Sequence, residues 1–111
     1  MQNIVRQLIT EVSCETEETR LYVTTTKTFS IGNKRKIVVE ECTLRGHRFP
    51  DVTIKAYIND PYEDVWYDCD GNECTSHVEW RKVFHEKTAH YDWLVDNAIA
   101  KAYGVLMCAM V

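Results

Sequence analysis

Three residues near position 70 have the donor atoms and part of the spacing of a metal site. Cys69, Cys74 and His77 form a C-x4-C-x2-H pattern, and thiolate sulfur and imidazole nitrogen are common ligands of tetrahedral zinc. His85 or His90 is available as a fourth ligand. The commonest cysteine pairs of zinc sites are separated by two residues, whereas four residues separate this pair.

The local geometry that the sequence predicts is unfavourable for zinc. If Asp70 and Gly71 form a two-residue hairpin turn, the two cysteines lie on one face of the hairpin. His77 is an odd number of residues from Cys74, so it points to the opposite face unless the strand bends first. We therefore expect no cofactor, and we keep a zinc-stabilised regulatory domain built on Cys69, Cys74 and His77 as an alternative.

The patterns that would support catalysis are incomplete. Asp68, Asp70 and Asn72 match the start of a calcium loop, but the glycine required at the sixth position of that loop is missing. His85 and His90 stand five residues apart, which rotates them by about 140° on a helix, whereas zinc proteases need a separation of four. We expect a protein that is not an enzyme and has no catalytic residues.

Acidic and aromatic residues dominate the segment that contains these donors. Between Ala56 and Trp80 there are seven acids and no lysine or arginine, and Trp and Tyr residues lie among the acids. Aromatic side chains are frequent anchors of protein interfaces, and carboxylates steer a basic partner toward them. The alternative is that the aromatic residues face the core, the acids face water, and nothing binds. The residues that we select as partner-binding are Asp60, Glu63, Asp64, Trp66, Asp68, Asp70 and Glu73.

This surface predicts a small, non-enzymatic protein that acts by protein–protein interaction. A basic partner is often a nucleic-acid-binding protein, and an acidic surface can occupy the groove in which such a protein holds phosphates. A stoichiometric inhibitor of the nucleic-acid-mimic type, as in viral or mobile-element accessory proteins, is one form that this function would take.

A basic region precedes the acidic segment and provides a further alternative, a nucleic-acid-binding module. Residues 34–48 include five cationic side chains, those of Lys34, Arg35, Lys36, Arg45 and Arg48. The net charge of −4 argues against this function, because domains that bind phosphate backbones usually carry a basic excess. We therefore favour a basic protein partner over direct binding to nucleic acid.

The composition predicts one compact domain over residues 1–111. Five cysteines, an odd number, do not form a secreted disulfide framework and indicate reduced thiols. No segment approaches the roughly 20 apolar residues of a membrane span. We expect a cytoplasmic protein without a membrane partner.

The predicted elements form an α+β fold. Apolar residues at helical spacing predict a short N-terminal helix over residues 4–12, followed by a loop at 14–18. Alternating β-branched and aromatic residues predict an antiparallel meander of three or four strands, with strands at 20–30, 36–44 and 51–59, while 76–87 fit a strand or a helix. A C-terminal helix, which Gly104 ends, is predicted to pack on one face of the sheet. The apolar residues 105–111 are covered either by this sheet or by a second copy in a homodimer.

Overall fold

The structure is a computed structural model that describes residues 9–108, without the side chains of residues 60–62 and 78. Five antiparallel strands form one sheet in chain order, and a single described helix follows them. The elements are β1 (Thr10–Glu18), β2 (Tyr22–Ile31), β3 (Arg35–Leu44), β4 (Asp51–Tyr67), β5 (Glu73–Thr88) and α2 (Asp92–Cys108). The fold is therefore α+β, as the sequence predicts.

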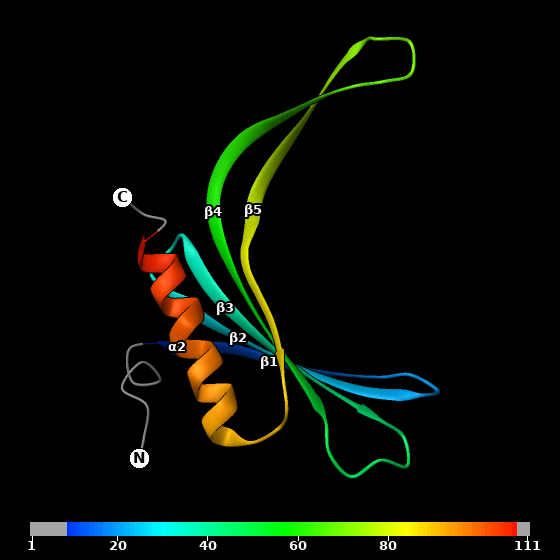
Figure 1. The fold of residues 1–111 in the computed structure, drawn as a ribbon, viewed down its shortest axis with the longest axis vertical. Helices are drawn as coiled ribbons and strands as arrows, with labels where there is room; N and C mark the ends of the chain where they lie inside the picture. The colour runs from blue at the N-terminus through cyan, green and yellow to red at the C-terminus, as the bar shows by residue number, and fades with distance from the viewer. Residues whose placement is uncertain (1–8, 109–111) are drawn as a thin grey trace.

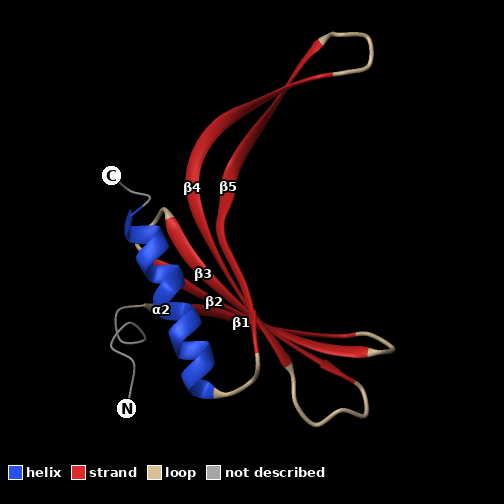
Figure 2. Ribbon diagram, in the orientation of Figure 1, coloured by secondary structure: helices blue, strands red, loops and turns tan. Residues whose placement is uncertain are grey.

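Helix α2 covers one face of the sheet, and no described element covers the other face (Figure 2). The helix contributes Ile99 and Leu106 to a core that also contains Ile37 and Ile54. Buried and more exposed residues alternate along β4, as in a sheet with one covered face: Val52, Ile54, Ala56 and Ile58 are buried, and the residues between them are not. We call the face without the helix the free face.

The last two strands are much longer than the others and form an arm. The end of β4 after Asn59 and the part of β5 before Trp80 pair only with each other. In Figure 1 these two segments extend beyond the rest of the sheet and curve away from α2. We define the arm as residues 60–79. The β4–β5 register shifts twice, next to Tyr57 and between Asn59 and Tyr62, and such bulges bend a strand pair. Pro61, which has no N–H to donate, lies inside the second shift.

Two predictions for the N-terminal segment are wrong. The helix expected over residues 4–12 is replaced from Thr10 onward by strand β1, and its residues 4–8 lie outside the described residues. The loop expected at residues 14–18 belongs to the same strand. All nine residues of β1 are exposed, so this edge strand is held by its pairing with β2 and shows no apolar face that a sequence pattern would reveal.

Two further predictions need correction. The sheet has five strands, not three or four, because residues 76–87 belong to β5 and residues 14–18 to β1. Gly104 does not end α2, which continues to Cys108 and buries Leu106 in the core. The described part of the apolar C-terminus is thus partly covered by the chain's own sheet, while Met107 and Cys108 remain exposed.

Candidate functional site

The arm has two exposed faces, and the selected residues are divided between them. Residues directly opposite each other in an antiparallel pair share a face. One face therefore carries Trp66 opposite Cys74 and Asp64 opposite Ser76. The other face carries Tyr67 opposite Glu73, followed by two further opposed pairs, Val65 with Thr75 and Glu63 with His77. The side chain of Asp60 lies outside the described residues.

Large apolar side chains of the arm are exposed on both faces. Trp66 is 53% exposed, Tyr67 69% and Val65 46%. The carboxylates of Glu63, Asp64 and Glu73 are exposed beside them. The interpretation in which these aromatic residues face the core therefore fails for Trp66 and Tyr67, because no described layer covers either face of the arm.

The tip of the arm is a five-residue loop organised by Asp68. Its Oδ1 accepts hydrogen bonds from the backbone N–H groups of Asn72 and Asp70, each at 2.9 Å. These donors, with Asn72 first, lower the pKa of Asp68 from its ordinary value of 3.8. Gly71 follows with a φ of +81°, a backbone conformation that favours glycine. Asp68 therefore holds the loop, while Asp70 next to it is exposed.

This loop replaces the two-residue turn that the sequence predicts at Asp70 and Gly71. Because Tyr67 pairs with Glu73, Cys74 lies opposite Trp66, and Cys69 lies exposed within the loop. His77 is on the face opposite to that of Cys74. The three candidate zinc ligands are thus not brought together.

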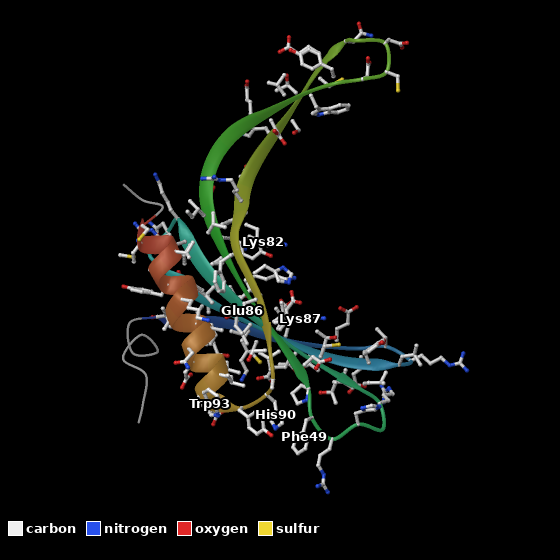
Figure 3. The ribbon with its side chains drawn as sticks, viewed as in Figure 1. Phe49, Lys82, Glu86, Lys87, His90 and Trp93 are labelled. Atoms are coloured by element: carbon white, nitrogen blue, oxygen red, sulfur yellow. The ribbon has the colours of Figure 1, made fainter. Side chains whose placement is uncertain are left out.

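The two histidines considered as a fourth zinc ligand, His85 and His90, have other neighbours. His90 stacks on Phe49, with ring centroids 4.2 Å apart and an interplanar angle of 3°, where the β3–β4 loop meets the start of α2 (Figure 3). His85 lies beside Lys82 on β5. Among the described residues no group of three His, Cys, Asp or Glu side chains is placed to hold a metal ion.

The structure also divides the basic region of residues 34–48. Lys34 to Lys36 lie at the start of β3, whereas Arg45 and Arg48 follow its end. Ten residues of strand separate these positions by about 30 Å. Arg35 points to the helix side, where its Nη1 donates to Met107 Sδ at 2.8 Å, and its neighbour Lys36 points to the free face.

The free face gathers a different set of cations, which sequence reasoning missed. Lys36, Tyr57 and Lys82 are direct neighbours across β3, β4 and β5. The next row contains Lys55 and His85, and Lys87 and Trp80 lie in the flanking rows. We call these seven residues the platform: Lys36, Lys55, Tyr57, Trp80, Lys82, His85 and Lys87. Only the strand register brings them together, since they are spread over residues 36–87.

Comparison with known proteins adds no functional information. No protein-family model matches the chain, and searches of curated proteins and of solved structures find no match. Within residues 9–108, no helix is long and apolar enough to cross a membrane.

Proposed function

We propose that this protein is a non-enzymatic binding protein that captures a basic protein partner through the arm. The observation that carries the proposal is the exposure of Trp66 and Tyr67 on a strand pair that projects from the sheet (Figure 1). The surrounding charge is entirely negative, because the arm contains seven acids and no lysine or arginine.

The physical basis is the incomplete burial of the arm. A two-stranded hairpin is marginally stable in water unless a third strand or another layer packs against it. A partner that covers the exposed aromatic side chains of such a hairpin stabilises the hairpin, and Trp and Tyr are enriched among the residues that dominate binding energies. The arm therefore presents anchors that the described chain itself leaves uncovered.

The carboxylates define the chemistry of the partner. Glu63, Asp64 and Glu73 lie around the exposed aromatic residues on both faces. Negative charge of this density accelerates encounter with a basic surface and disfavours acidic proteins. A nucleic-acid-binding protein has such a surface, so inhibition by occupation of its phosphate-binding groove is the specific form that we propose.

The test is capture of partners with an arm variant and a matched control. E63Q/D64N/E73Q removes three charges from the arm strands and leaves Asp68 in place to hold the loop. E11Q/E15Q/E17Q removes three charges from the exposed strand β1. We expect the arm variant and W66A to lose the partner at physiological salt, while the β1 variant retains it.

Two further results decide the proposal. A photoreactive residue at Tyr67 should crosslink to the captured protein, whereas the same residue at the exposed Val12 of β1 should not. Excess DNA should displace a partner that is held through its phosphate-binding groove. Equal capture by the arm and β1 variants, with both folded by circular dichroism, would show that the arm is not the binding surface.

A further inference from the structure

We propose that the platform on the free face binds single-stranded nucleic acid, either DNA or RNA. This function is independent of the arm and uses the opposite charge. It differs from the sequence-based alternative because the residues involved come from β3, β4 and β5, not from residues 34–48 alone. The inference rests on three observations: the charge of the chain outside the arm, the arrangement of the lysines, and the two aromatic side chains among them.

The net charge of the whole chain conceals a basic excess in the residues outside the arm, which we call the body. The arm contains seven of the 17 acids and none of the 13 lysine and arginine residues. The rest of the chain therefore has ten acids against 13 basic residues, a net charge of +3, although the whole chain has −4. The acidic excess is confined to the projecting arm, so the net charge is no argument against binding phosphates on the body.

The lysines of the platform form one cationic area on neighbouring strands. Lys82 Nζ lies 3.2 Å from His85 Nδ1, so these two side chains are direct neighbours on the free face. Lys55 is partly neutralised by Glu40, at 2.9 Å. In Figure 3, Lys82 and Lys87 point away from α2, whereas Glu86 between them points toward it. The salt bridge of Glu86 with Lys101 of the helix agrees with this orientation.

The aromatic residues of the platform favour a single strand. The Lys36 ammonium lies over the Trp80 ring, 4.2 Å from its centroid, and 5.4 Å from the centroid of Tyr57. A base that stacks on Trp80 would place its phosphate within reach of Lys36, whose flexible stem allows the ammonium to move from the ring to the phosphate. Stacking of this kind needs an unpaired base, because the base faces of a duplex are already stacked on each other.

A second occupant, the acidic arm of another copy of this chain, fits the charge of the platform less well. Its carboxylates are spread over both faces of the arm, so only part of them would meet the lysines. A phosphodiester chain has one charge per nucleotide and supplies bases for the aromatic residues. The nucleic acid therefore matches both the cations and the rings, and the second copy becomes an outcome of the test.

The test measures fluorescence anisotropy of labelled 20-nucleotide oligo-dT and oligo-U, with a 20-base-pair duplex for comparison. Three uncompensated lysines predict that log K falls with log salt at a slope of about −2, since each phosphate contact on a single strand contributes about −0.7. K36Q/K82Q/K87Q should abolish this salt dependence. The matched control R20Q/R48Q/K101Q removes three charges outside the platform and should leave binding unchanged.

A substitution of the ring separates stacking from charge. W80A should weaken binding by roughly 5- to 150-fold, the range found when one stacked base loses its aromatic platform. W80F keeps an aromatic ring and should retain most of the affinity, which guards against a loss that reflects misfolding. Tighter binding of oligo-U than of oligo-dT would identify RNA as the source of the strand, and the reverse would identify DNA.

Several outcomes would overturn the inference. These are an absence of binding at 20 mM salt, equal effects of the platform and control variants, and duplex binding as tight as single-strand binding. A salt-sensitive dimer in light scattering, lost in both K36Q/K82Q/K87Q and E63Q/D64N/E73Q, would show that a second copy's arm occupies the platform. None of these results decides whether the arm captures another protein, so the two proposals fail separately.

Discussion

Removal of the arm should leave a folded body with the opposite net charge. The perturbation replaces residues 60–79 with Asn-Gly. Because Asn59 and Trp80 are directly opposed, a two-residue turn can join them without a change of register. All buried core residues of the described chain lie outside the removed segment.

The expected effect on stability is small. Since the core is untouched, we expect the free energy of unfolding to change by no more than about 1 kcal/mol. For a domain of roughly 90 residues, this corresponds to a shift of the melting temperature of about 4–8 °C. Calorimetry or circular dichroism measures this shift directly. Loss of cooperative unfolding, or a much larger decrease, would show that the arm stabilises the body.

The expected effect on oligonucleotide binding follows from the distances along β5. Glu79 and Glu73 lie three and nine residues from Lys82, which places the acids of the arm strands about 10–30 Å from Lys82 at about 3.3 Å per residue, with the loop acids Asp68 and Asp70 slightly farther away. At a mean of about 20 Å in water, each carboxylate repels a phosphate by about 0.2 kcal/mol. Seven of them contribute about 1.5 kcal/mol before screening.

Screening by salt then decides how much of this repulsion weakens the binding of oligo-dT. About half of this repulsion survives at 0.01 M salt, where the Debye length is about 30 Å, and less than a tenth survives at 0.15 M. Removal of the arm should therefore tighten oligo-dT binding about threefold at 0.01 M salt and leave it unchanged at 0.15 M. An equal gain at both salt concentrations would refute this reasoning, because it would mean that the arm obstructs the platform by direct contact.

Three further predictions concern stability and pH. Leu106→Ala should destabilise the fold by about 2–5 kcal/mol in urea titration, because the Leu106 side chain is fully buried. Met107→Ala in the same helical turn should change stability by less than about 1 kcal/mol, because Met107 is exposed. Equal effects would show that the end of α2 is not packed. The pKa of Asp68 is lowered by the N–H donors of Asn72 and Asp70. The hydrogen bonds that order the loop are therefore present above pH 3.8 and lost as pH falls through the lowered pKa. An NMR titration of the Asp68 carboxyl measures this pKa, and a value at or above 3.8 would contradict the prediction. The Lys55 ammonium donates a hydrogen bond to the Glu40 carboxylate, which raises the pKa of Lys55 above 10.5. This pair therefore stabilises the fold below pH 10.5, by up to about 1 kcal/mol, and loses its effect as pH rises through the raised pKa. A double-mutant cycle of K55M and E40Q that shows no coupling at pH 7 would exclude it.

The parts of the fold that bury one face were predictable from the sequence. Alternation at Val52, Ile54, Ala56 and Ile58 predicted the start of β4, and the structure confirms that these residues face the core. Strands β2 and β3 and most of α2 were found for the same reason. Burial produces a periodic pattern, and the sequence shows this pattern wherever burial occurs.

The parts that bury nothing were not predictable in the same way. Strand β1 is exposed throughout, so Cys14 to Glu18 show no apolar periodicity, and their polar residues are as typical of a loop as of an edge strand. In β5 the extra residue near Val83 interrupts the alternation of side chains. The part of β5 that belongs to the arm is exposed to solvent on both faces and therefore shows no apolar alternation. The extension of α2 past Gly104 depends on packing of Leu106 in the core, which overrides the ordinary preference for glycine beyond a helix end.

The two candidate sites, the arm and the platform, also differ in how far the sequence predicts them. The acidity of the arm is a contiguous property of the sequence and could be read directly. The platform is a property of register, because Lys36 and Lys82 are 46 positions apart in the chain and meet only through Tyr57 between them. A charge count along the chain therefore assigned the basic residues to residues 34–48, whose two ends lie at opposite ends of β3.

The single extra residue beside Pro61 has a consequence for how this molecule could diversify. Residues 62–67 pair one-to-one with residues 73–78, so the loss of one residue between Asn59 and Tyr62 would leave Asp64 opposite Ser76 and Trp66 opposite Cys74. Each face of the arm would keep its residues, while the loss of the bulge would remove the local bend of the strand pair. A one-codon deletion at this position would thus change the direction in which the arm projects at nearly constant sequence.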